Sequence, residues 1–163
     1  WTEFITNAWT QSQDLVDYFL LDTRDIPQAL WNGCDAESGT YACPWQVRSF
    51  PFHHSGNTSL SNENQVNQYN CSTANESGPE VRYLLNIREP GTLNVSISVD
   101  DESNIDPDVH LLWGDDANAC LARGHHSFSQ WVSPGRYMVV VDTWVNENGD
   151  VLTGAYDLEI TLD

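Results

Sequence analysis

The chain has no lysine, and its 163 residues carry only six basic side chains, all arginine, against 24 Asp and Glu. The resulting formal charge of −18 disfavours nucleic acid and anionic membranes as partners, because phosphate recognition needs a basic surface. Long apolar runs are also missing, so we expect no membrane span. The start at Trp1 lacks the basic and then apolar pattern of a signal peptide, which indicates a mature fragment. Cations and neutral polymers remain compatible partners.

Sequence motifs of catalysis are absent as well. The chain has no G-x-S-x-G elbow, no H-E-x-x-H helix and no phosphate-cradling glycine loop. Its histidine pairs, His53-His54 and His125-His126, are poor chelates on a strand, where adjacent side chains point to opposite faces. His110 is expected to be exposed or paired with a carboxylate. The sequence predicts a protein that is not an enzyme, although the many acids leave a glycosidase-like carboxylate pair open.

Four cysteines are present without a C-x-x-C pair, which argues against a zinc knuckle or a redox motif. The short segment between Cys34 and Cys43 favours a local disulfide, which leaves Cys71 and Cys120 to pair over a long range. Disulfides imply an oxidising, extracellular compartment. Sequons of the N-x-S/T type agree with secretion and mark candidate glycosylation sites at Asn57, Asn70, Asn75 and Asn94.

Alternating apolar and polar residues dominate the chain from Val81 onward. The runs Val81–Ile87, Thr92–Val99 and Tyr156–Leu162 each place apolar residues at every second position. The run Tyr137–Val141 is apolar on both faces, as in a central strand. Turn residues such as Pro90-Gly91 separate the runs. This pattern predicts five or six strands after Val81 in an all-β, antiparallel, jelly-roll-like sandwich that spans residues 46–163.

The first 45 residues are predicted to form a separate extension with a local disulfide loop. Residues 10–20 fit a short helix capped by Thr10, and they fit an extended aromatic arm as well. The segments Val47–Phe52 and His53–Asn70 are expected to be an edge strand and a polar surface loop. Three tryptophans near strands are expected in the core or at its rim: Trp113, Trp131 and Trp144. Four others lie outside the alternating region: Trp1, Trp9, Trp31 and Trp45.

An acidic segment joins two of the predicted strands, with five carboxylates within the nine residues 100–108. Such a cluster is either splayed into water or neutralised by a hard cation with oxygen ligands, for which calcium is the natural candidate. Asp106 and Asp108 alternate along one extended segment and therefore point to the same side. An EF-hand is excluded, because the glycine and the closing Glu of that loop are absent.

Five motifs in order resemble the bacterial pre-peptidase C-terminal domain over roughly residues 70–163, and more weakly back to Cys43. They are Glu76–Tyr83, Pro90–Leu93, Asp106–Leu112, Pro134–Asp142 and Gly154–Leu158. The resemblance implies a jelly-roll-like sandwich appended to secreted hydrolases, in a family whose members often bind calcium and sometimes polymers such as collagen. It also implies that Asp106 and Asp108 form the D-x-D element of the calcium site. Asp142, with Asp100 or Asp101, would complete that site.

These observations predict a secreted, non-catalytic, calcium-binding module for binding, adhesion or extracellular assembly. The expected partners are calcium ions and a polysaccharide or protein polymer. One alternative is an accessory domain that captures substrate for a secreted hydrolase or protease. Another is a self-assembling subunit, a homo-oligomer or filament, whose N-terminal arm adds to the sheet edge of a neighbour.

Overall fold

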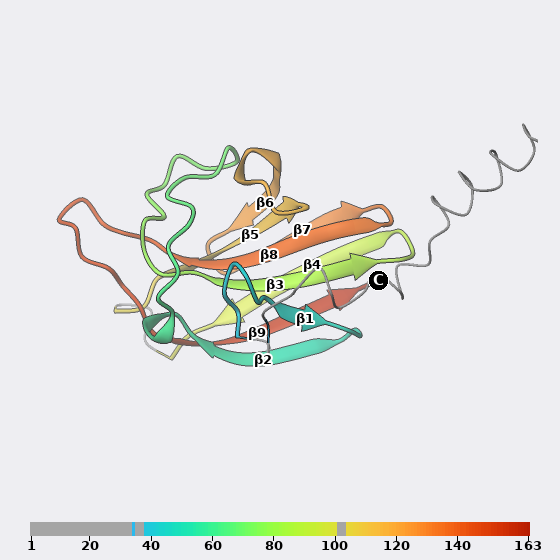
Figure 1. Cartoon of the computed structure of the whole chain (residues 1–163), viewed down its shortest axis with the longest axis horizontal. Helices are drawn as coiled ribbons and strands as arrows, with labels where there is room; N and C mark the ends of the chain where they lie inside the picture. Colours follow the sequence, from blue (N-terminus) through green and yellow to red (C-terminus); the bar gives the residue numbers. More distant parts are fainter. Residues whose placement is uncertain (1–33, 35–37, 101–103) are drawn as a thin grey trace, which may run out of the picture. The chain divides into compact units, whose positions relative to one another are not determined.

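The computed structural model describes Cys34, residues 38–100 and residues 104–163 (Figure 1). The predicted N-terminal helix or arm, with Trp1, Trp9 and Trp31, lies outside these residues, as does Asp101. The boundary between residues 45 and 46 stays a prediction. The described residues form nine strands: β1 (Trp45–Val47), β2 (Phe52–Asn57), β3 (Val81–Ile87), β4 (Gly91–Ser98), β5 (Pro107–Trp113), β6 (Cys120–Gly124), β7 (Ser127–Val132), β8 (Gly135–Thr143) and β9 (Ala155–Leu162). The same part of the chain contains the short 3₁₀ helices η3 (Thr58–Leu60) and η4 (Ala117–Ala119).

The strands form two stacked sheets, so the predicted all-β sandwich is confirmed (Figure 1). One sheet has the order β1-β3-β8-β5-β6 and the other the order β2-β9-β4-β7. Neighbouring strands are antiparallel except β1 and β3, which pair in parallel. No helix among the described residues is long and apolar enough to cross a membrane.

The core lies between the sheets and is filled by the alternating residues that the sequence indicated. In β4, Leu93, Val95 and Ile97 are buried while the residues between them are less so. In β9, Tyr156, Leu158 and Ile160 repeat the pattern. Each strand thus turns one side to the core because successive side chains point to opposite faces.

Residues 61–80, here called the covering loop, lie against the outward face of the five-stranded sheet, where Tyr69 stacks on His110 of β5 and donates to Asp142 of β8. The loop is tied to itself where Glu80 N donates to Glu63 O at 3.0 Å, and to η4 where Asn70 N donates to Ala117 O at 3.2 Å. Outward residues of β8, including Met138 and Val140, are 1% and 0% exposed. This confirms the prediction of a central strand that is apolar on both faces.

Three local predictions were wrong. Residues 53–57 belong to β2, which pairs with β9, so the loop predicted from His53 to Asn70 begins later. The strand predicted over residues 47–52 is divided, since β1 ends at Val47 and β2 begins at Phe52. Trp131 is not a core residue, because it lies on the outer side of β7 and is 62% exposed. Trp113 does lie at the rim, with its ring 5.0 Å from that of Tyr137.

Candidate functional site

Ionisable side chains gather in a buried layer between the covering loop and the five-stranded sheet. Strand alternation turns them outward from the core, and the loop then shields them from water. From the loop come Tyr69, Glu76 and Glu80, and from the strands come Arg82, Asp108, His110 and Asp142. All seven residues are 0–1% exposed. Burying charge is costly unless it is paired, so the contacts of each group decide what the layer can do.

At one end of this layer, the charge of Arg82 is balanced. Its Nη2 lies 2.8 Å from Oε1 of Glu80, and its Nη1 pairs with Asp115. The Tyr41 ring lies 4.9 Å from the guanidinium carbon. One guanidinium thus links two carboxylates at this end of the layer.

At the other end, Glu76, Asp108 and His110 converge. Nε2 of His110 lies 3.6 Å from Oε1 of Glu76, and Nη2 of Arg123 lies 3.8 Å from the same oxygen while pairing with Asp108. Burial raises the pKa of Asp108 to about 6 and also raises the pKa of Glu76. Burial lowers the pKa of His110 to about 3, so its imidazole is neutral at pH 7.

A second, more exposed group shares Asp108. Nδ1 of His125 lies 3.1 Å from Oδ1 of Asp106 and 3.2 Å from Oδ1 of Asp108. In each group of three the candidate ligand atoms lie within 4.8 Å of one another, which suits a metal ion. We call Glu76, Asp108 and His110 the inner triad, and Asp106, Asp108 and His125 the outer triad.

A third group, Cys71, His110 and Cys120, has similar spacing. Its two sulfurs are joined in a disulfide and offer no thiolate to a metal. The predicted pairs Cys34–Cys43 and Cys71–Cys120 are both confirmed. The second one fastens the covering loop to the start of β6.

The predicted calcium ligands are only partly brought together. Asp106 and Asp108 lie in the outer triad, and Asp100 is exposed after the end of β4. Asp142 stands opposite Asp108 in the β5–β8 register, but its Oδ2 accepts a 2.6 Å hydrogen bond from Tyr69. Calcium binding itself stays a prediction.

Sequence reasoning missed Glu76, His110 and His125 as candidate ligands. His110 follows Asp108 by two residues on a strand, and that alternation was a usable signal. Glu76 lies in a polar stretch whose local sequence gives no sign of burial. His125 lies in the short turn between β6 and β7, and only the strand pairing brings it to Asp106.

The four predicted glycosylation sites all lie on described residues, and their use stays a prediction. Asn57 caps η3, with its side chain accepting from Ser59 N. Asn70 and Asn75 lie in the covering loop, and Asn94 lies on the outer side of β4.

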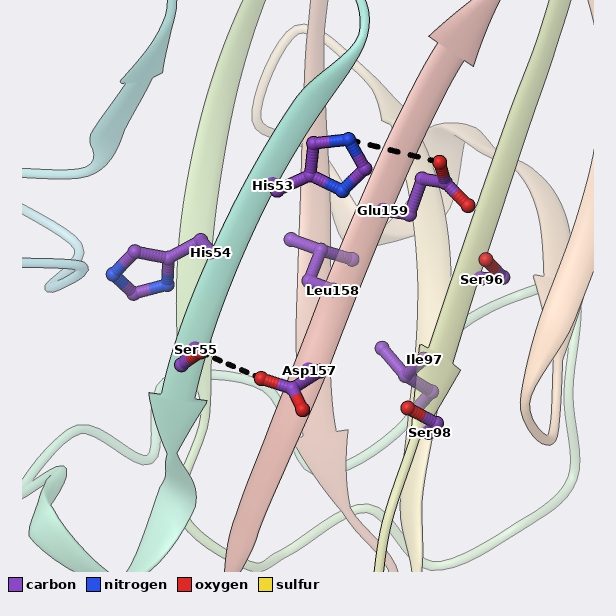
Figure 2. Close-up of a pocket in the computed structure, with 9 residues that line it drawn as sticks. All are labelled: His53, His54, Ser55, Ser96, Ile97, Ser98, Asp157, Leu158 and Glu159. Atoms are coloured by element: carbon purple, nitrogen blue, oxygen red, sulfur yellow. Dashed lines mark hydrogen bonds and ion pairs between the residues drawn. The ribbon is translucent and has the colours of Figure 1, made fainter.

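The outer face of the four-stranded sheet carries an open pocket of about 570 Å³ (Figure 2). Figure 2 shows His53 and Ser55 on β2 beside Glu159 and Asp157 on β9. Oγ of Ser55 donates to Oδ1 of Asp157 at 2.6 Å, and Nε2 of His53 lies 3.7 Å from Oε1 of Glu159. The other residues that line the pocket are His54 of β2, Leu158 of β9, and Ser96, Ile97 and Ser98 of β4.

Strand register extends this surface across the sheet. Ser96 stands between Glu159 and Ser127, and Asn94 stands between Thr161 and Ser129. One row further, Thr92 stands beside exposed Trp131. Thr92 and Ser96 are four positions apart on β4, so Trp131 lies roughly 13 Å along the strands from the pocket. We call this surface the polar face; its four strands carry no Arg or Lys.

Comparisons with known proteins find structural likeness only. No family model and no curated protein matches the sequence. One similar solved structure is the pre-peptidase C-terminal domain of collagenase from Bacillus anthracis, with a TM-score of 0.49 and 16% identity over 77% of this chain and 97% of that chain. It belongs to the domain family that the sequence motifs resemble. Another is Aeromonas hydrophila PliG, a periplasmic lysozyme inhibitor of g-type lysozyme, with a TM-score of 0.47 and 12% identity over 78% of this chain and 98% of that chain.

Proposed function

We propose that the chain is a secreted, non-catalytic module that binds a neutral polysaccharide on its polar face. The observation that carries this proposal is the composition of that face. Hydroxyl, amide and carboxylate groups stand in register around the pocket, and an exposed indole lies further along the same surface. Sugar hydroxyls both donate and accept hydrogen bonds, so they match such a set of groups.

Charge favours a neutral polymer over an anionic one. Asp157 and Glu159 lie at the centre of the face, and the whole chain carries a formal charge of −18. Carboxylates accept strong hydrogen bonds from neutral hydroxyl groups, whereas they repel a sulfated or carboxylated chain. Trp131 supplies a large flat apolar surface on which the apolar side of a sugar ring can stack.

The two disulfides support secretion, because such bonds persist in oxidising compartments. Calcium remains part of the proposal as a stabilising ion held by Asp106 and Asp108. Oδ1 of Asp106 and Oδ1 of Asp108 both lie beside Nδ1 of His125, at 3.1 Å and 3.2 Å, so the two carboxylates face one point at which a cation could be held. A module of this kind would serve adhesion, assembly or substrate capture beside a secreted hydrolase.

Sedimentation of the full chain with insoluble cellulose, chitin and a neutral glucan tests the proposal. We expect binding to at least one of them, with Trp131→Ala and the double variant Asp157→Asn/Glu159→Gln each weakening it by about tenfold or more. Trp113→Ala is the matched control, because Trp113 is 48% exposed on the other sheet. It should bind as the original chain does. Failure to bind any of these polymers, or an equal loss in the Trp113 variant, would contradict the proposal.

A further inference from the structure

The inner triad combines full burial with unmet hydrogen-bonding capacity. Glu76, Asp108 and His110 are 0%, 1% and 0% exposed. Both carboxylate oxygens of Glu76 and both ring nitrogens of His110 have no hydrogen-bond partner among the described residues. Buried polar atoms are nearly always satisfied in native proteins, because leaving one without a partner costs free energy. One ring nitrogen of His110 and the carboxylates of Glu76 and Asp108 have ligand atoms within 4.8 Å of one another, and this convergence of buried groups indicates a bound species.

A proton shared by Glu76 and Asp108 is the simplest rival occupant, since their carboxyl groups lie within hydrogen-bonding reach. The shared proton would give one oxygen of Glu76 a hydrogen bond, but it would leave both ring nitrogens of His110 without a partner. A metal ion accepts electron pairs from carboxylates and a neutral imidazole together. A metal ion would therefore provide a partner for a nitrogen of His110 as well as for the carboxylates, whereas a proton would not.

The donor set selects the class of metal. One imidazole nitrogen with two carboxylate oxygens is a ligand set of zinc and its first-row neighbours, whereas calcium takes oxygen ligands. We propose that Glu76, Asp108 and His110 form a buried binding site for a divalent transition metal of the Zn²⁺ class. This goes beyond the polysaccharide binding proposed above and involves the opposite sheet.

The surroundings would orient the ligands. The Tyr69 ring stacks on His110 with centroids 3.8 Å apart and an interplanar angle of 15°. The same tyrosine is held by its hydrogen bond to Asp142. The stack holds the plane of the His110 ring against β5.

Arg123 is the competitor for the ion. Its guanidinium pairs with Asp108 and lies 3.8 Å from Glu76, so it supplies positive charge where the metal would lie. Its side chain is 31% exposed, which leaves a path by which it can turn toward solvent. Arg123→Gln should therefore tighten Zn²⁺ binding, on the order of tenfold, by removing a nearby like charge.

Calorimetric titration of the chelator-treated full chain with Zn²⁺ tests the site. We expect one tight site that is weakened more than about 100-fold by His110→Gln or Glu76→Gln, because even outer contacts are worth roughly 10- to 100-fold. His53→Gln on the polar face and His125→Gln in the outer triad should retain it. Loss of the tight site in the His125 variant but not in the His110 variant would overturn the proposal, as would the absence of any tight site.

Anomalous diffraction at the zinc edge from crystals of the original chain grown with Zn²⁺ gives an answer independent of variant folding. A peak among Glu76, Asp108 and His110 supports the proposal. A peak only at the outer triad or at His53, or no peak, overturns it. Sedimentation with polysaccharides is a separate measurement, so failure of the metal site and failure of the proposed function are distinguishable.

Discussion

Tyr69 donates a 2.6 Å hydrogen bond from its hydroxyl to Oδ2 of Asp142, and both side chains are buried. Burial raises the pKa of Asp142 well above its ordinary value, and the Tyr69 hydrogen bond opposes that rise. The bond joins the covering loop to the central strand β8. The carboxylate of Asp142 is thereby already hydrogen-bonded within the protein.

Tyr69→Phe should lower the free energy of unfolding by about 2 kcal/mol, because it leaves a buried carboxyl oxygen without its donor. Urea denaturation followed by fluorescence measures the change. Tyr137→Phe is the control, since its hydroxyl donates to Ser133 O at 2.8 Å and should cost only about 1 kcal/mol. Equal stability of the Tyr69 variant and the original chain would show that the bond contributes nothing net.

The disulfides should differ in their contribution. Cys71 and Cys120 are 49 residues apart and Cys34 and Cys43 are 9 apart, so the longer loop loses more unfolded-state entropy on closure. Replacing Cys71 and Cys120 with Ser should lower the free energy of unfolding by about 4 kcal/mol. Replacing Cys34 and Cys43 should lower it by about 3 kcal/mol, and chemical denaturation measures both changes. Loss of the Cys71–Cys120 bond also frees the covering loop, so the rate of amide hydrogen exchange in residues 61–80 should rise. Faster exchange there after removal of the Cys34–Cys43 bond instead would contradict this assignment.

His54 should give stability a pH dependence. Burial lowers the pKa of His54 below its ordinary value of 6.5, with its ring turned inward toward the Tyr83 hydroxyl at 2.8 Å. The unfolded chain therefore takes up a proton that the folded chain resists, and stability falls as pH drops below about 6.5. His54→Gln should make this part of the curve of unfolding free energy against pH less steep, while the contribution of buried His110, whose pKa is also lowered, remains. His53→Gln, at an exposed neighbouring position, should leave it unchanged, and equal slopes in the original chain and the His54 variant would refute the prediction.

Calcium should raise the melting temperature and chelation should lower it, because an ion bound only by the folded state stabilises that state. At a calcium concentration of 100 Kd the gain would be about 2.7 kcal/mol. Asp106→Asn should reduce the shift, while Glu89→Gln at an exposed turn should preserve it. Identical melting curves with calcium and with chelator would rule out a stabilising calcium site.

Local sequence was sufficient for much of the sandwich. Strand alternation is a property of neighbouring residues, so β4 and β9 could be predicted with their core sides. The spacing of the cysteines was enough to pair Cys34 with Cys43, and the other pair followed by elimination. Parallel pairing of the short β1 with β3 was not predictable, because it depends on a contact across about 38 residues (Trp45 to Tyr83).

The residues of the candidate metal sites also fall into two groups, those placed by local sequence and those placed only by tertiary contacts. The sequence by itself determined that Asp106 and Asp108 point to one side of an extended segment, because alternation fixes the direction of side chains. Only the tertiary structure decided that Glu76 and His110 join Asp108, since the covering loop reaches the sheet through distant hydrogen bonds and the Cys71–Cys120 disulfide. The same long-range packing buries Tyr69, Glu76 and Glu80 of a polar loop, because burial depends on what lies across from a residue in space. Its sequence neighbours alone do not set it.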